Sequence, residues 1–275
     1  LAALGSELAV GLNEELRDAL EQESSRVFAS AERALSEASD ALQAIRSGLG
    51  YEGARTYLIL LQNQNEVRAT GGFIGATASL TIANGTLASL DYVDSVAVDV
   101  PPLINNPPAP EPLFWYLWMG RLLFRDANWS PSFVESATTL ITMYESSQRV
   151  SLDGAVAVTK RLALDLVGVI GKVNVAGIDV PVDRELAGLY IEGALPYECQ
   201  QRHASATPKR CFDEDLVFGI VDALQAGLGE VRRSELVELF SAHLLRKNVL
   251  AYVKDSALQQ LLHGQGWTGA IGKPT

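Results

Sequence analysis

The stretch from Thr56 to Val93 reads TYLILLQNQNEVRATGGFIGATASLTIANGTLASLDYV and decides the fold. Thr56 to Leu61 is a continuous apolar, β-prone run, too short for a free-standing helix and of the right length for a buried strand. Phe73 to Ile82 and Thr86 to Val93 flank Asn84-Gly85, a pair suited to a two-residue hairpin turn because both central positions need a positive φ. The sequence therefore predicts a buried strand followed by a hairpin of the same sheet.

A polar loop joins that strand to the hairpin, at one edge of the predicted sheet. Its arginine, Arg68, precedes the double glycine Gly71-Gly72, and an arginine beside bare backbone amides suits a phosphate or a carboxylate. The alternative is that Glu66 and Arg68 only pair with each other and that the glycines mark a bulge. We predict Arg68 as a catalytic residue, with a set of ligand-binding residues from the same loop, namely Asn63, Asn65, Thr70, Gly71 and Gly72.

Further polar residues follow the hairpin and precede a helix start. Asp94 and Asp99 are predicted as catalytic residues and as ligands of Mg²⁺, which takes one or two carboxylates together with phosphate oxygens. Arg121 and Arg125 are predicted to bind the ligand. The alternative for the neighbouring Asp126 and Asn128 is that they support the helix cap at Ser130-Pro131.

Strand and helix signals alternate along the rest of the chain. Strands are expected at 153–159 and 248–254, and a strand pair broken at Ala176-Gly177 is expected at 172–180. Helices are expected at 160–170, 184–191, 214–228, 234–246 and 255–263, and Asp183 and Asp255 are expected to cap the second and the last of them. This alternation predicts an α/β fold, a layered mixed β-sheet flanked by helices. Residues 51–275 are expected to form a single domain, with a cysteine-bracketed insertion at about 193–213.

Residues 1–50 are expected to form a long N-terminal helical extension, because leucines recur at four-residue steps among charged residues, as at Leu8, Leu12, Leu16 and Leu20. The apolar stripe is thin. Three alternatives follow: the helix packs along its own domain, pairs with a partner or acts as a stalk.

The aromatic run from Phe114 to Phe124, FWYLWMGRLLF, follows the proline-rich loop from Pro101 to Pro112. It is interpreted either as a buried segment under that loop or as an apolar lip that receives a lipid tail or touches a membrane surface.

Cys199 and Cys211 bracket a polar stretch without a core pattern. We predict a disulfide between them and, with it, an extracytoplasmic location; the alternative is two free thiols in a cytosolic loop. The net charge of −11 disfavours nucleic-acid binding. No apolar run reaches a membrane span. The chain opens on Leu1 rather than Met, so it is expected to be a fragment or a processed form from which an upstream signal or anchor has been removed.

Motifs of other enzymes are missing. The sequence has no phosphate-binding G-x-x-x-x-G-K-[ST], no G-x-S-x-G, no H-E-x-x-H and no dinucleotide fingerprint.

The blocks YLILLQNQNEVRATGGFIG, NWSPSF, LDGAVAV and KNVLAYVKDSALQQLLHGQGWTGAIG together resemble a bacterial family, domain of unknown function 4012. That resemblance implies an envelope protein anchored to the cytoplasmic membrane. The layout is also similar to the LytR-CpsA-Psr ligases, which take glycopolymers from polyprenyl-pyrophosphate carriers. This similarity implies that Arg68 and either Asp94 or Asp99 bind pyrophosphate and Mg²⁺, although the R-S-D-T and P-R-D blocks of those enzymes are missing.

Two functions are therefore expected in different classes. The first is the binding, and transfer, of a lipid-linked glycopolymer outside the cytoplasm. The alternative is a non-catalytic module that assembles with another envelope protein.

Overall fold

The computed structural model describes residues 2–99, 106–199, 208–227 and 230–272. Its helices and strands, in chain order, are α1 (Ala2–Gly48), β1 (Arg55–Asn63), β2 (Phe73–Ala83), β3 (Thr86–Asp94), α2 (Ser95–Val98), α3 (Glu111–Leu117), η2 (Phe124–Asp126), α4 (Phe133–Gln148), β4 (Gly154–Thr159), α5 (Lys160–Ile170), α6 (Arg184–Ile191), α7 (Pro208–Gln225), α8 (Glu230–Leu245), β5 (Val249–Val253) and α9 (Ser256–Gly264).

The sheet has five strands in the order β3-β2-β1-β4-β5. β1 and β4 are parallel, and the other neighbouring strands are antiparallel. The predicted hairpin turn is confirmed, with φ of 51° at Asn84 and 74° at Gly85. The predicted α/β fold, a mixed sheet flanked by helices behind a long N-terminal helix, is also confirmed.

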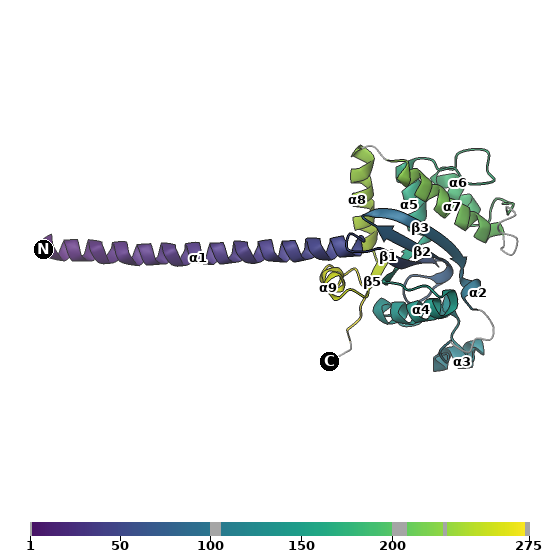
Figure 1. Ribbon diagram of the computed structural model, residues 1–275, viewed down its shortest axis with the longest axis horizontal. Coiled ribbons are helices and arrows are strands. Elements are labelled where there is room, and N and C mark those ends of the chain that lie inside the picture. Colours follow the sequence, from purple (N-terminus) through teal and green to yellow (C-terminus); the bar gives the residue numbers. More distant parts are fainter. Residues whose placement is uncertain (1, 100–105, 200–207, 228–229, 273–275) are drawn as a thin grey trace.

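Helices cover both faces of this sheet (Figure 1). Leu58 and Leu60 point to the face that packs against α4, where Phe133 and Leu140 are buried. Side chains alternate along a strand, so Leu61 points to the opposite face. The second core on that face is built mainly from α5, α6 and α7.

Helix α1 projects away from the sheet for most of its length and contacts α9 near its end (Figure 1). Apolar side chains along it stay exposed, including Phe28 at 70%, Leu35 at 72% and Leu42 at 62%. Packing along its own domain is therefore limited to the last turns of α1. Within the described residues, no helix combines the length and apolar character needed to cross a membrane.

Three local predictions need correction. Ser130 does not cap the helix, because its hydroxyl accepts a bond from the Ser132 N–H and α4 begins only at Phe133. The strand pair expected at 172–180 is reduced to a single bridge between Val173 and Val182. The helix expected from 214 begins earlier, since α7 starts at Pro208.

The aromatic run divides between the two interpretations. Leu122 and Phe124 are buried in the core beside α4, whereas Phe114 through Trp118 are exposed on and after α3. Of the proline-rich loop before it, residues 101–105 lie outside the described part of the chain.

The two cysteines form the predicted disulfide, and their Cα atoms are 5.5 Å apart. Cys211 belongs to α7, so this helix begins inside the segment predicted as an insertion. Residues 200–207, between the two cysteines, lie outside the described residues.

Candidate functional site

A cavity of about 430 Å³ lies where the parallel strands β1 and β4 end. The cavity lies on the α5–α7 side of the sheet, and its volume is within the range of small-molecule sites. Most of its walls are apolar, and the residues responsible are Leu61, Phe73, Ala76, Val158, Ala163, Ile191, Leu216 and Val217. The first predicted strand therefore ends at a cavity.

Polar and charged side chains complete the lining. They come from the end of β1, the loop after it, the β4–α5 junction and α7, and are Gln62, Asn63, Glu66, Thr159, Lys160, Arg210 and Asp213. The cavity thus combines an apolar interior with two cationic and two acidic groups. Such a lining suits an amphiphilic ligand.

Arg68, the central residue of the predicted site, is paired with Asp126. Its Nε and Nη2 atoms donate to Asp126 Oδ1 at 3.1 and 2.9 Å. The guanidinium also lies over the ring of Phe73, 5.3 Å from its centroid. Phe73 lines the cavity and Arg68 does not. Glu66 accepts a bond from Asn63 instead of pairing with Arg68.

Thr70 and the double glycine hold the loop against the sheet. The Thr70 hydroxyl oxygen accepts bonds from Gln62 and Asn128, and the Gly72 carbonyl accepts a further bond from Asn128. Gly71 has a φ of +123°, and a Cβ there would lie 2.7 Å from Gln62 Oε1 and 3.7 Å from Thr159 Cγ2. Glycine is therefore required at position 71, where the loop passes close to the start of α5.

Asp94 and Asp99 have different partners. Asp94 accepts from the Val96 N–H at 2.9 Å and from Arg210 Nη1 at 2.5 Å, which brings it beside a lining residue. Asp99 accepts from the Phe124 N–H at 2.8 Å, and burial raises its pKa despite that bond. In the part of the chain that the structure describes, no group of three or more His, Cys, Asp or Glu side chains is placed to hold a metal. The Mg²⁺ site stays a prediction.

The remaining predicted residues lie outside the cavity lining. Arg121 donates to the Asn106 carbonyl at 3.0 Å, and Arg125 Nε is 3.8 Å from Asp126 Oδ2. The Asn65 N–H donates to Asn63 Oδ1 at 3.2 Å. Of the predicted side chains, Asn63 lines the cavity directly and Asp94 approaches it through Arg210.

Sequence reasoning missed most of the residues that line this cavity, and Thr159, Lys160 and Arg210 are among them. Thr159 and Lys160 stand where β4 passes directly into α5, and a strand that ends on threonine before a helix is a signal that can be read from sequence. Arg210 lies in the segment interpreted as an insertion, where no periodicity indicated that it would face the sheet.

The fold is of the α/β class, and its cavity lies at the carboxyl ends of the two parallel strands, which is a usual place for a small-molecule site. Residues 52–187 match the family model described as "Protein of unknown function (DUF4012)". The family resemblance predicted from the sequence blocks is thereby confirmed over that range. No curated protein matches the chain.

Several solved structures are similar to this chain at low identity. TagV from B. subtilis is 12% identical with a TM-score of 0.43, over 78% of this chain and 81% of that chain. TagU from B. subtilis is 11% identical with a TM-score of 0.40, over 74% and 80%. Protein gbs0355 from Streptococcus agalactiae is 10% identical with a TM-score of 0.47, over 78% and 73%. At such identities and TM-scores, the likeness bears on neither the ligand nor the activity of this chain.

Proposed function

We propose that this chain is an extracytoplasmic domain that binds a polyprenyl-(pyro)phosphate-linked glycopolymer. The observation that carries the proposal is the cavity, whose mostly apolar lining also contains two cationic side chains, Lys160 and Arg210, the second of which is paired with Asp94. Burying an apolar chain there is favourable at roughly 25 cal/mol per Å² removed from water. Cationic side chains in the same lining suit the phosphate at the end of that chain.

The disulfide supports an extracytoplasmic location for this domain. A bond such as Cys199–Cys211 forms and persists in oxidising surroundings, outside the cytoplasm. Attachment to the cytoplasmic membrane, through a segment outside this sequence, is part of the proposal and follows from the family resemblance.

Transfer of the polymer is the catalytic form of the same proposal. In a pyrophosphate-linked substrate, the oxygen of an acceptor hydroxyl would form a bond to the polymer-bearing phosphorus while the bridging P–O bond breaks. The prenyl phosphate would leave and take up the hydroxyl proton. Arg68, Asp94 and Asp99 are the candidates for this step. Both oxygens of Asp94 already accept bonds, so this carboxylate does not suit a cation while it is paired with Arg210. A metal titration tests the Mg²⁺ prediction separately.

A cavity-filling variant tests ligand binding. Gly75 lines the cavity, and a Cβ there would meet no atom within 4 Å, so Gly75→Leu adds its side chain into the open space. Gly120→Leu is the matched control, because Gly120 is exposed, equally unobstructed and outside the lining. We expect titration with farnesyl pyrophosphate, a short soluble prenyl pyrophosphate, to show binding by wild type and Gly120→Leu and at least tenfold weaker binding by Gly75→Leu. Equal affinities in all three proteins would refute the proposal.

A specific observation favours a second candidate, the non-catalytic assembly module. The exposed apolar residues Phe28, Leu35 and Leu42 of α1 recur every seven residues, which is the spacing of a helix that pairs with another helix. Leu35→Glu should then abolish association with a partner envelope protein or a second copy, as measured by sedimentation. A wild-type chain that stays monomeric and cross-links to no envelope protein would remove this candidate.

A further inference from the structure

We propose that the N-terminus of α5 is an anion subsite of the cavity, built to take a phosphate group. This inference rests on the proposed function, because it assigns the position of the anionic end of the ligand in the same cavity. It moves the phosphate from Arg68, which is paired with Asp126, to the β4–α5 junction.

The first observation is the uncapped start of α5. This helix runs for 11 residues from Lys160, and its N-cap residue Thr159 makes no side-chain cap bond. The first N–H groups of a helix lack partners within the helix, and the helix dipole favours negative charge at this end. Thr159, Lys160 and Ala163 all line the cavity, so these N–H groups begin at its wall.

The second observation concerns the hydroxyl group of Thr159 itself. Thr159 is 5% exposed, and its Oγ1 atom has no hydrogen-bond partner in the described structure. Buried hydroxyls are nearly always bonded, so this one is unusual. Thr159 itself lines the cavity, so a rotation of its side chain about the Cα–Cβ bond would bring this hydroxyl to a phosphate oxygen bound there.

The surroundings leave space for such a group. Gly71 lies beside Thr159, and a Cβ on this glycine would be 3.7 Å from the threonine Cγ2, so the loop places no side chain next to that methyl group. Lys160 and Arg210 contribute positive charge to the lining, while Glu66 and Asp213 contribute negative charge. Because these charges balance, selectivity for an anion depends on the directed donors of the α5 N-terminus.

Two probes separate a free anion from a lipid head group. Inorganic pyrophosphate offers the anion alone, and farnesyl pyrophosphate offers it with an apolar chain. We expect Thr159→Val, which keeps the shape and removes the hydroxyl, to bind farnesyl pyrophosphate about tenfold more weakly, the usual effect of losing a hydrogen bond to a charged group. Thr159→Ser, which keeps the hydroxyl, should stay within about threefold of wild type by the same reasoning. If Thr159→Val also weakens the binding of inorganic pyrophosphate about tenfold, the free anion is sufficient to occupy the subsite. If the wild-type protein binds farnesyl pyrophosphate but not inorganic pyrophosphate, only the lipid-linked anion occupies it.

The outcomes separate the two proposals. If Thr159→Val binds as tightly as wild type while Gly75→Leu does not bind, the subsite is wrong and the proposed function stands. If Thr159→Val weakens inorganic pyrophosphate binding while Gly75→Leu has no effect on farnesyl pyrophosphate, the subsite stands and the proposed function falls. Binding of neither probe by the wild-type protein overturns both. A thermal midpoint of Thr159→Val equal to or above that of wild type shows that any loss of binding is not a loss of fold.

Discussion

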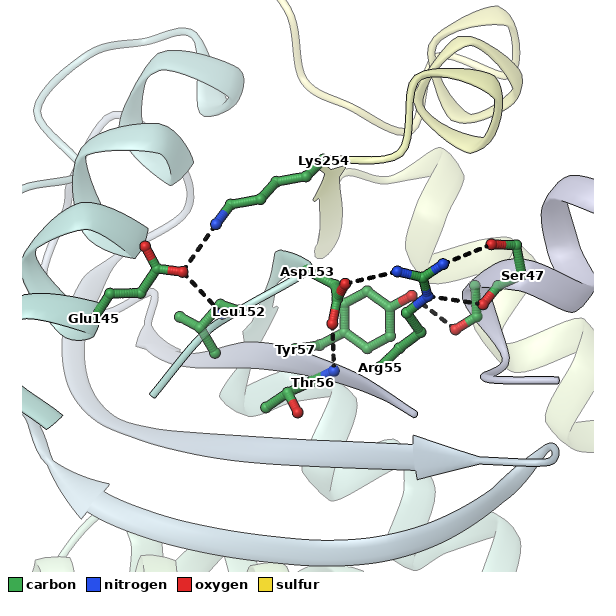
Figure 2. A network of polar contacts seen from close by, with 9 residues as sticks. Ser47, Arg55, Thr56, Tyr57, Glu145, Leu152, Asp153 and Lys254 are labelled. Carbon is green, nitrogen blue, oxygen red and sulfur yellow. Dashed lines mark hydrogen bonds and ion pairs between the residues drawn. The ribbon is translucent and has the colours of Figure 1, made fainter. Parts of the chain in front are cut away.

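Arg55 and Asp153 join the beginnings of the two parallel strands, with Nη1 of the arginine 3.0 Å from Oδ1 of the aspartate (Figure 2). The other carboxylate oxygen of Asp153 accepts the Thr56 N–H at 2.8 Å. Arg55 also donates to Ser47, to its carbonyl at 3.2 Å and its hydroxyl at 3.0 Å. This pair therefore fixes the end of α1 against the sheet, at the end of β1 opposite to the cavity.

Replacing Asp153 should destabilise the domain at this junction. Asp153→Ala removes both an ion-pair partner and the acceptor of a backbone N–H, so we expect a loss of about 1–3 kcal/mol in the free energy of unfolding. Glu32→Ala, at an exposed position of α1, should change it by less than about 0.5 kcal/mol. Urea denaturation measures both, and equal effects of the two substitutions would contradict this assignment.

Glu145 should make stability depend on acid pH. Burial raises the pKa of this carboxyl, but bonds from Lys254 Nζ and the Leu152 N–H, each 2.8 Å long, outweigh burial and leave the pKa below its ordinary value of 4.5 (Figure 2). A lowered folded-state pKa stabilises the fold above the unfolded-state pKa, and that contribution is lost as the pH falls through the folded-state value. Wild type should thus exceed Glu145→Gln in stability at neutral pH, with the difference shrinking below about pH 4.5. Denaturation across this range checks the prediction, and a constant difference would speak against it.

The Arg68–Asp126 pair should be energetically coupled. Asp126 is only 9% exposed and Arg68 is 33% exposed, so Arg68→Ala leaves a largely buried carboxylate with Arg125 as its remaining cation. We expect a double-mutant cycle of Arg68→Ala and Asp126→Ala to give a coupling of about 0.5–3 kcal/mol. Additive effects would show that the pair contributes nothing to stability.

The same variant tests the predicted role of Arg68 with phosphate. Arg68→Ala is assayed with farnesyl pyrophosphate at a temperature where the variant is folded. Abolished binding in folded protein supports the role predicted from the sequence, and retained affinity removes Arg68 from the binding residues.

Local patterns in the sequence predicted the centre of the fold well. The apolar run of β1 and the Asn84-Gly85 turn act over a few residues, so they form a sheet and a hairpin in nearly any context. Asp183 and Asp255 were likewise placed correctly as helix caps, because each carboxylate accepts from an N–H three residues on.

Only part of the candidate site could be predicted from the sequence. The partner of Asp94 is Arg210, 116 residues further along the chain, and no periodicity links two positions so far apart. Arg68 was placed in the correct loop, but its partner Asp126, 58 residues away, compensates its charge. The sequence therefore predicts that a charged residue lies at a strand end, near the edge of the sheet. Whether its charge is available to a ligand is decided by tertiary packing.

The hydroxyl of Thr159 should reduce the stability of the ligand-free protein. Because its Oγ1 is buried without a partner, Thr159→Val removes an unsatisfied group at constant shape, so we expect the free energy of unfolding to stay equal or to rise by about 1 kcal/mol. Thr77→Val is the matched comparison, since Thr77 is also buried but its hydroxyl donates to the Val93 carbonyl at 3.0 Å. Removing that hydrogen bond should lower the free energy of unfolding by about 1 kcal/mol. Urea denaturation of the three proteins without ligand measures the contrast. If Thr159→Val loses as much stability as Thr77→Val, the Thr159 hydroxyl already has a partner in the folded protein and is not kept for a phosphate.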